Sequence, residues 1–387
     1  MLDETAIAAL LPDLIALRRD IHAHPELAYA EHRTAALVAT ALEELGLEVT
    51  RGVGGTGVVG VLRRGTSPRS IGLRADMDAL PIQEEGGPAH ASRHDGIFHG
   101  CGHDGHTAML LGAARYLARD ARFEGTVNFI FQPAEEGEGG ARAMVRDGLF
   151  ERFPCDRVFA LHNWPDLPAG SLRTRPGPIM ASADKFRITL QGRGGHAALA
   201  HQTPDVLLAA AQLVQQLNTI VSRRVAATQA AVLSVTRISG GHAHNVLPAS
   251  CEIVGTVRTF DAAVQDRIEA SLRAMCQGAA QASETRIEVE YDRYYPATIN
   301  DEAAALAALE AARRVSDDVA LAPDPAFTSE DFAFMLQERP GAYLWLGQRS
   351  EEHQAPLHHP HYDFNDRIMA TGIGVFVALV ETHLAPQ

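Results

Sequence analysis

The order of strand-like and helical segments constrains the fold of this chain more than any other feature. Short runs rich in Val, Ile and Phe alternate with segments of helical spacing in the first half of the sequence. Strands that alternate with helices are typical of an α/β layer with a largely parallel sheet. The predicted strands are 57–62, 70–75, 126–131, 157–161 and, near the end, 342–346, and the predicted helices are 14–24, 31–45, 105–119, 302–315 and a last one after Asp366.

The pattern changes between Ala183 and Pro296. Strands are predicted at 185–191, 231–238, 251–259 and 286–291, with helices at 204–221 and 261–282 and with Thr203 as the N-cap of the first helix. The order β-α-β-β-α-β is that of a compact ferredoxin-like domain. We therefore expect an α/β protein in which residues 1–183 and 297–387 form one discontinuous domain. Residues 184–296 would be inserted into it, with hinges near 183 and 296.

Charge and composition exclude several classes of partner. The formal net charge is −14, and no Lys/Arg cluster is visible, so a nucleic-acid partner is not expected. No run reaches the ~18 apolar residues that a membrane span requires. Residues 1–11 lack the basic start and cleavage pattern of a secretory signal. The four cysteines are scattered, which argues against a disulfide framework, so we expect a cytoplasmic protein.

The densest group of chemically active side chains is His99-Gly100-Cys101-Gly102-His103-Asp104-Gly105-His106. Glycines let the backbone turn tightly, so that nearby side chains can point at one centre. Cys, His and carboxylate are the usual ligands of zinc and similar divalent ions. A polar loop in which Asp104 caps the next helix would explain one Asp, but not three His and a Cys within eight residues. The segment therefore predicts a metal site.

Three further polar segments follow predicted strands, namely 74–81, 132–137 and 162–164. Ligands in open α/β sheets bind outside the carboxyl ends of the strands, so these segments can converge on one site. The second contains the adjacent pair Glu135-Glu136, which repels itself unless a cation or a proton intervenes. One carboxylate can bind metal while its neighbour takes a proton from water. Most such pairs are solvated surface, but this one directly follows an apolar strand.

A last cluster, Leu357-His358-His359-Pro360-His361, lies between a predicted strand and a predicted helix. It could be a surface His tract or a source of one more ligand.

These motifs, in this order, resemble the M20 metallopeptidase family, and within it the aminoacylase-like branch of hippurate hydrolases, N-acyl amino acid amidohydrolases and auxin-conjugate hydrolases. The resemblance covers nearly the whole chain. Besides the segments already named, it rests on Leu17 to His22, His24 to Leu27, Gly194 to Ala198, Asn245 to Pro248, Gly255 to Arg258 and Ser329 to Phe332.

The resemblance implies a catalytic site in the larger domain with two divalent metal ions per subunit, which could be zinc, manganese, cobalt or nickel. Glu135 would be the general base, and Asp78 would orient a ligand. In many M20 branches a His and a bridging Asp fill ligand positions, whereas the pattern of this chain uses Cys101, and a softer thiolate ligand shifts metal preference. The ligands would be Cys101, His103, Glu136, His162 and His358, the last being preferred to His359 because it follows Leu357 as in the family pattern.

The resemblance also implies a role for the inserted domain in dimerisation and as a lid, so that a homodimer or homotetramer is expected. His196 would approach the scissile carbonyl, often from the partner chain. Asn245 and Arg258 would hold the substrate carboxylate or the oxyanion. The residues alone would equally suit two turn positions and an Arg on a strand surface.

The implied reaction is hydrolysis of the amide bond of a small N-acyl amino acid, of the hippurate or N-acetyl type, to a carboxylic acid and a free amino acid. An alternative within the same class is a deacetylase of a biosynthetic intermediate such as N-acetyl-diaminopimelate. Two other classes are a cysteine hydrolase that uses Cys101 and a non-catalytic binding protein with the same fold. The second would require a broken site, whereas Glu135 and all the expected ligands are present.

Overall fold

The structure is a computed structural model that describes residues 2–119 and 123–386. It divides into two compact units. The first contains the chain up to Ile179, Ile299–Asp324 and the chain from Asp331 onward, and the second contains Met180–Thr298 and Pro325–Glu330. The short segment Pro325–Glu330 was not singled out by the sequence pattern.

The first unit is built on one eight-stranded mixed sheet, and the predicted α/β class is confirmed. Its middle strands β4, β3, β5 and β16 are mutually parallel, while β1 and β2 add an antiparallel edge. At the other edge β6 runs antiparallel to β16 and parallel to β15. In spatial order the strands are β1 (Glu48–Val53), β2 (Gly57–Arg64), β4 (Gly125–Gln132), β3 (Ser70–Asp76), β5 (Arg157–Pro168), β16 (Gly341–Arg349), β6 (Leu172–Thr174) and β15 (Val319–Leu321).

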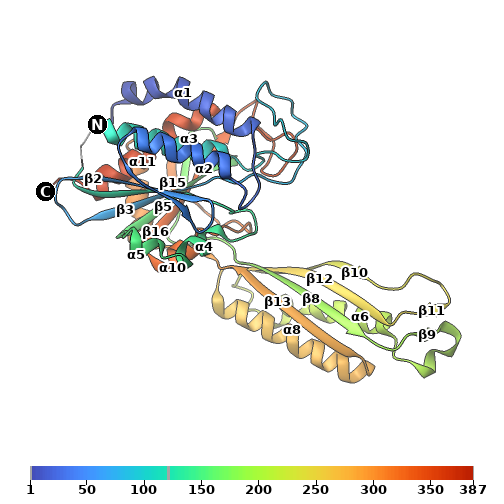
Figure 1. Ribbon diagram of the computed structural model, residues 1–387. Coiled ribbons are helices and arrows are strands. Elements are labelled where there is room, and N and C mark those ends of the chain that lie inside the picture. Colours follow the sequence, from blue (N-terminus) through green and yellow to red (C-terminus); the bar gives the residue numbers. More distant parts are fainter. Residues whose placement is uncertain (1, 120–122, 387) are drawn as a thin grey trace. The chain divides into compact units, whose positions relative to one another are not determined.

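Helices cover both faces of this sheet. Figure 1 shows α1, α2, α3 and α11 on one side and α4, α5 and α10 on the other. The apolar core lies mainly between the sheet and the first group, where α3 is buried along almost its whole length. The helices are α1 (Glu4–Ala23), α2 (His32–Glu44), α3 (His103–Arg119), α4 (Gly140–Arg146), α5 (Leu149–Arg152), α9 (Glu302–Ala312), α10 (Ala333–Glu338), α11 (Met369–His383) and the 3₁₀ turn η2 (Asp366–Ile368). Two short strands, β7 (Gly177–Met180) and β14 (Thr298–Asn300), pair with each other.

The second unit has the predicted β-α-β-β-α-β order. Its antiparallel sheet places the first strand between the third and the fourth, which is the split arrangement of a ferredoxin-like fold. The sheet consists of β10 (Ala231–Ser239), β12 (Ser250–Thr259), β8 (Ala183–Gln191) and β13 (Arg286–Tyr295). The remaining elements are α6 (Val206–Leu217), α7 (Thr219–Arg224), α8 (Ala262–Ser283), the strand pair β9 (Gly195–His196) and β11 (Val246–Leu247), and the 3₁₀ turn η1 (Ala197–Gln202).

The predicted start of the helix at 204–221 is wrong. The N-cap is Asp205, whose carboxylate accepts the backbone N–H groups of Leu207 and Leu208 at 3.0 Å each. A carboxylate at this position satisfies two otherwise unpaired N–H groups, which Thr203 does not. The segment is also divided into α6 and α7 at Asn218.

Two bulk expectations can be compared with the structure. Within the described ranges, no helix combines the length and the apolarity that crossing a membrane requires. All four cysteines are buried free thiols.

Candidate metal centre

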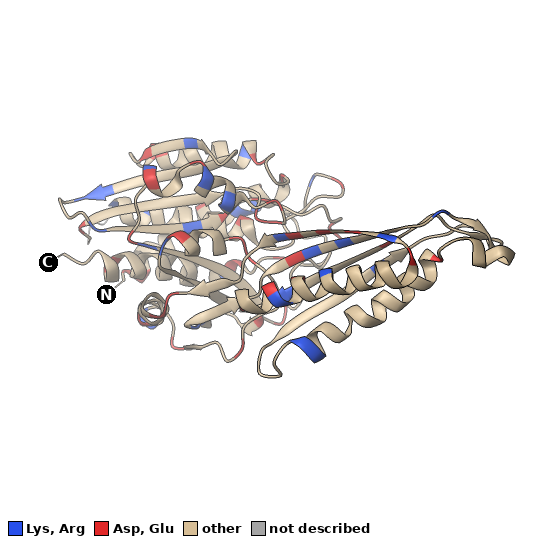
Figure 2. Ribbon diagram, turned by 90° about the horizontal axis from the view of Figure 1, so that it is seen from below, with Lys and Arg blue, Asp and Glu red and all other residues tan. Residues whose placement is uncertain are grey.

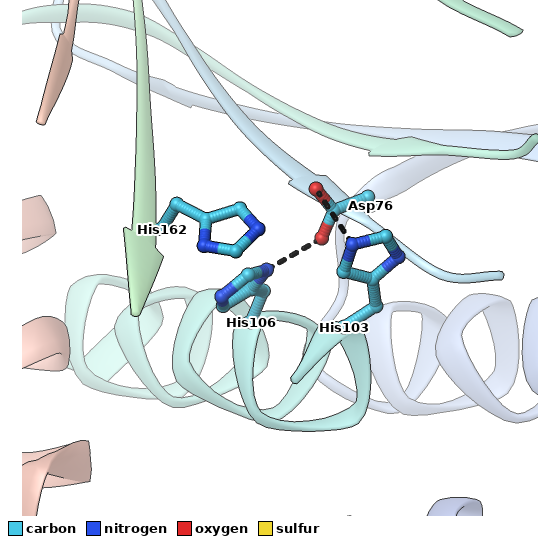
Figure 3. Close-up of side chains that lie close together, drawn as sticks. All are labelled: Asp76, His103, His106 and His162. Carbon is cyan, nitrogen blue, oxygen red and sulfur yellow. Dashed lines mark hydrogen bonds and ion pairs between the residues drawn. The ribbon is translucent and has the colours of Figure 1, made fainter. Parts of the chain in front are cut away.

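Four buried side chains from three elements meet near the end of the central strands (Figure 3). Asp76 ends β3, His162 lies in β5, and His103 and His106 share the first turn of α3. Their ligand atoms lie within 4.8 Å of one another. The Nδ1 atom of His106 donates to Asp76 at 2.6 Å, and its Nε2 bonds to Oδ1 of Asn163 at 2.7 Å. Both nitrogens of His106 are therefore occupied, so this residue supports the cluster and does not offer a free ligand atom.

His103 presents to the same space a nitrogen, Nε2, that lies 3.7 Å from Oδ2 of Asp76 (Figure 3). Its Nδ1 donates to Oδ1 of Asp78 at 3.1 Å, while its buried Nε2 makes no hydrogen bond to any described residue. The Oε1 atom of Glu136, 3.9 Å from this Nε2, is also buried without a hydrogen bond. Buried polar atoms are costly unless they are paired, so the two atoms fit a shared metal ion. Burial alone would lower the pKa of His103, but the carboxylates of Asp76 and Asp78 raise it to about 10, which shows how strongly this space favours a positive charge.

Cys101 joins the cluster through a turn that requires glycine. Gly102 has a φ of +89°, and a Cβ atom on it would lie 2.3 Å from Oδ1 of Asn163. The turn places Sγ of Cys101 3.4 Å from Nε2 of His162. Burial, followed by the charges of Glu136 and Glu135, raises the pKa of the Cys101 thiol well above its usual value. A thiolate therefore forms here only when a cation balances its charge.

His162 is prepared for a ligand role by the same surroundings. Its Nδ1 donates to the backbone carbonyl of Asn163 at 2.7 Å, which leaves Nε2 with a free electron pair. Burial, together with the neighbouring His106, lowers the pKa of His162 well below its usual value, so the imidazole is neutral. Neutral imidazole is the form that binds metal.

The loop with Glu135 and Glu136 is fixed at three points. Ala134 has a φ of +54°, and its N–H donates to the buried carboxylate of Glu31 at 2.8 Å. The N–H of Glu136 donates to Oδ2 of Asp78 at 2.9 Å, and the N–H of Asp331 donates to Glu135 at 3.4 Å. One ligand atom each of Glu135, Glu136 and His103 lies within 4.8 Å of the others. The loop therefore holds two carboxylates at the cluster.

His358 reaches Glu136 from the C-terminal loop. Its backbone is left-handed, with a φ of +65°, and its N–H donates to the carbonyl of Gly100 at 2.8 Å. The Nε2 atom lies 3.2 Å from Oε1 of Glu136, and Cys101 completes a group of three possible ligands. The ring of His359, in contrast, accepts the N–H of His361. The contact with Glu136 favours His358 over His359 as a candidate metal ligand.

The structure thus brings the five expected ligands, Glu135 and Asp78 into one region of the first unit, where most of them are buried and His358 is exposed. It also adds Asp76 and His106, which sequence reasoning did not assign. One signal for His106 was available in the sequence, namely its spacing of three residues from His103. The predicted helix began two residues too late to include His103, whereas α3 begins at His103. A spacing of three residues places both rings on one face of a helix.

The three site residues expected in the second unit do not all lie together. His196 and Asn245 are adjacent, because β9 pairs with β11 and the N–H of Ala197 donates to the carbonyl of Asn245 at 3.1 Å. Both are exposed. Arg258 lies near the opposite end of β12, eight residues beyond Ser250.

A buried ionic network supports the first turn of α3 from outside. Arg18 contacts Asp104 at 3.3 Å, Asp363 at 3.1 Å and Asp366 at 2.8 Å. His22 donates to the same Asp104 at 2.9 Å. Burial would lower the pKa of His22, but hydrogen bonds to Asp104 and Glu84 raise it to about 9. Asp104, which lies inside the first turn of α3 and does not precede it as a cap, is therefore held by two cations from α1, next to the candidate ligand His103.

Comparisons with known proteins agree with this chemistry. The sequence profile of peptidase family M20/M25/M40 matches residues 72–382. A hippurate hydrolase of Campylobacter jejuni is 40% identical in an alignment of 384 residues that covers 97% of this chain and 99% of that protein. An N-acetyldiaminopimelate deacetylase of Priestia megaterium is 37% identical and covers 90% of this chain and 92% of its own length. The crystal structure of a dinuclear metal-binding M20 peptidase from Bacillus subtilis superposes with a TM-score of 0.83 at 34% identity, covering 97% of this chain and 99% of that one.

Proposed function

The chain belongs to peptidase family M20/M25/M40, and we propose that it is an amidohydrolase that cuts N-acyl amino acids of the hippurate or N-acetyl type into a carboxylic acid and a free amino acid. One observation supports this most directly. Glu136 has a buried oxygen and His103 a buried nitrogen, 3.9 Å apart, neither of which makes a hydrogen bond, while a second carboxylate, Glu135, lies beside them. Such a site can bind cations and move a proton.

The residues present fit two divalent ions, with Cys101, His103, Glu136, His162 and His358 as the proposed ligands. When bound, such ions lower the pKa of water and polarise an amide carbonyl. Glu135 would take the proton of the attacking water and return it to the leaving nitrogen. Asp78 would orient His103. The ion could be zinc, manganese, cobalt or nickel, with the soft sulfur of Cys101 affecting the choice.

The test is a substrate panel on protein stripped with a chelator and reconstituted with each of the four metals. We expect stripped protein to be inactive and at least one metal to restore cleavage of hippurate or an N-acetyl amino acid. Cleavage restricted to N-acetyl-diaminopimelate would favour the alternative that the Priestia relative suggests. Full activity after complete metal removal would contradict the proposal and would favour a cysteine hydrolase instead.

We further propose that two subunits complete each site. A strand rises about 3.3 Å per residue, so the eight residues of β12 between Ser250 and Arg258 span roughly 25 Å. His196 lies on β9, near the Ser250 end of the strand, as the Gly192–Ala249 backbone hydrogen bond indicates. A small N-acyl amino acid is shorter than that span and cannot contact His196 and Arg258 of one chain together. If both bind substrate, one of them belongs to a partner.

This sharing is testable by subunit exchange. Glu135→Gln and His196→Ala chains should each be inactive with normal metal content. Random pairing into dimers should restore about one quarter of wild-type activity, because only heterodimers contain one complete site. The control is a mixture of Glu135→Gln chains with Glu135→Gln, Asn245→Ala double-variant chains, which supplies no intact base. No recovery despite demonstrated exchange would show that His196 acts in its own chain or not at all.

We propose that the protein is a homodimer or homotetramer. We also propose that it is cytoplasmic, since four buried free thiols suit a reducing compartment.

A further inference from the structure

The four-stranded sheet of the second unit has one apolar face and one charged face. Phe186, Ile188, Ile253 and Val257 pack in the apolar core with residues of α6 and α8. Side chains alternate along a strand, so the intervening residues of β8 and β12 point the other way. Figure 2 shows acidic and basic residues interspersed on these strands. We call this side the charged face, and its members include Lys185, Arg187, Glu252, Thr256 and Arg258.

Arg258 differs from the other basic residues of the charged face. Lys185 pairs with Asp292 at 3.3 Å, and Arg187 pairs with Glu252 at 2.9 Å. Arg237 on β10 contacts the same Glu252. Arg258 has no carboxylate partner among the residues that the structure describes, although its side chain is half-buried. A guanidinium in this position is available to an anion.

Thr256 fixes the direction of this guanidinium. Its hydroxyl donates to the backbone carbonyl of Asp184 at 2.8 Å, which uses the only proton of the hydroxyl. A lone pair of Oγ1 is then directed to Nη1 of Arg258, which donates to it and to the carbonyl of Val257 at 3.0 Å. The orientation of the arginine therefore depends on one side-chain hydroxyl and one backbone carbonyl.

The anchor of Thr256 is itself rigid. The carboxyl group of Asp184 is fully buried, with Oδ1 bonded to Gln265 at 2.6 Å and Oδ2 bonded to Tyr291 at 2.7 Å. These bonds connect β8 with α8 and β13. The carbonyl that receives the Thr256 hydroxyl is consequently held in place from three elements.

Both bonds that fix Arg258 use Nη1 alone. Its Nη2 and Nε have no partner within the described part of the chain, and together they form one edge of the guanidinium fork. That edge matches the two oxygens of a carboxylate. We propose that Thr256 is a positioning residue that turns this edge of Arg258 toward the substrate, and that it thereby sets selectivity for N-acyl substrates with a free carboxylate. The inference rests on the proposed function, in which Arg258 binds the substrate carboxylate.

The test compares Thr256→Val with the wild type on hippurate and on the corresponding neutral amide, in the metal-loaded enzyme. Valine preserves the shape of threonine but removes the hydroxyl. We expect KM for hippurate to rise roughly 10-fold, within the range of a lost charge-assisted contact, with little change in kcat or in cleavage of the amide. Thr256→Ser should restore the wild-type KM. Thr236→Val is the matched control, because Thr236 donates to a backbone carbonyl of the same sheet, at 3.3 Å, without touching an arginine.

Two variants separate the possible failures. Arg258→Met should raise KM for hippurate more than Thr256→Val does. If Arg258→Met has the expected effect and Thr256→Val has none, the positioning role of Thr256 is wrong and the proposed function stands. If neither variant changes KM for hippurate, Arg258 does not bind the carboxylate. The positioning role of Thr256 and the role given to Arg258 in the proposed function are then both wrong. If Thr256→Val does not fold, Thr256→Ala and Thr256→Ser provide the same comparison, and equal KM values for these two would overturn the inference.

Discussion

The carboxylate of Asp78 serves His103 with one oxygen, at 3.1 Å from Nδ1, and the backbone of Glu136 with the other, at 2.9 Å. It thus orients one proposed ligand and fixes the loop of a second. Asp78→Ala should therefore lower metal affinity by about 10- to 100-fold, the usual effect of removing the partner of a metal-binding histidine. Competition with a chromophoric chelator measures this directly. Asp166→Ala, which removes an exposed carboxylate of β5, is the control. Equal affinities would show that Asp78 does not support the site.

Glu135→Gln should keep the metal but lower kcat by about 10²- to 10⁴-fold or more, because the amide cannot accept the proton of the attacking water. Elemental analysis and steady-state kinetics on the same preparation test both parts. The matched control is Glu138→Gln, an exposed position three residues later in the same loop. Near-normal turnover of Glu135→Gln would remove Glu135 from the role of general base.

Cys101→Ser should weaken metal binding more than folding. Serine has nearly the shape of cysteine, but its hydroxyl is a poorer ligand than a thiolate. Metal occupancy after dialysis should fall, while the melting temperature of the stripped protein should change little. Cys155→Ser controls for loss of a buried thiol elsewhere in the first unit. Unchanged occupancy and affinity would mean that Cys101 is only structural.

Arg18→Met should destabilise the metal-free protein by about 3–5 kcal/mol, because it removes a buried charge from three carboxylates and leaves Asp104 with only His22 of its two cations. Arg19 offers a sharp comparison, since it also contacts Asp366, at 2.8 Å, but its side chain is 49% exposed. Arg19→Met should cost at most about 1 kcal/mol. Urea denaturation gives both values, and similar costs for the two variants would contradict the buried-network interpretation.

His383 should make stability depend on acidity. Burial lowers its pKa in the folded protein to about 4, whereas an unfolded chain has the ordinary value near 6.5. Between these values the unfolded chain binds more protons, so stability is full above pH 6.5 and falls as the pH drops toward 4. Phenylalanine can keep the stacking of this ring on Phe159. When the pH falls from 7 to 5, the free energy of unfolding of His383→Phe should therefore decrease by about 1 kcal/mol less than that of the wild type. Urea denaturation of metal-free protein at both pH values tests this, with His94→Phe as a surface control. Equal decreases in the free energy of unfolding for His383→Phe and the wild type would refute the prediction.

The sequence predicted the α/β class and the ferredoxin-like unit because both depend on the order of local segments. It also pointed to the segment around Cys101 and to the Glu135-Glu136 pair as sources of ligands, and the structure brings these side chains close together, because short glycine-flanked motifs keep their donors together. Asp76 and His106 were missed for the opposite reason. Their bond joins the end of β3 to α3 across 30 residues of sequence, and only the packing of that helix on the sheet brings them together.

His162 shows a second limit of sequence reasoning. The apolar run of β5 ends at Leu161, so His162 was expected just after the strand, yet the strand continues to Pro168. Its polar residues are tolerated inside the protein because Asn163 bonds to His106 and, at 2.7 Å, to the hydroxyl of Tyr362. Partners that lie so far away in the chain cannot be read from the local pattern.

Gly102 has a consequence for how this protein can change over time. Two features of the structure require glycine at this position. The backbone φ is +89°, and a Cβ atom would lie 2.3 Å from Oδ1 of Asn163. Neither reason for excluding other residues at position 102 involves a contact with metal or substrate. Codon 102 should therefore be as intolerant of replacement in a library selected for a different substrate as in one selected for the original reaction. Evolution toward new substrates is thereby confined to positions outside this turn, while the turn itself passes unaltered from one activity to the next.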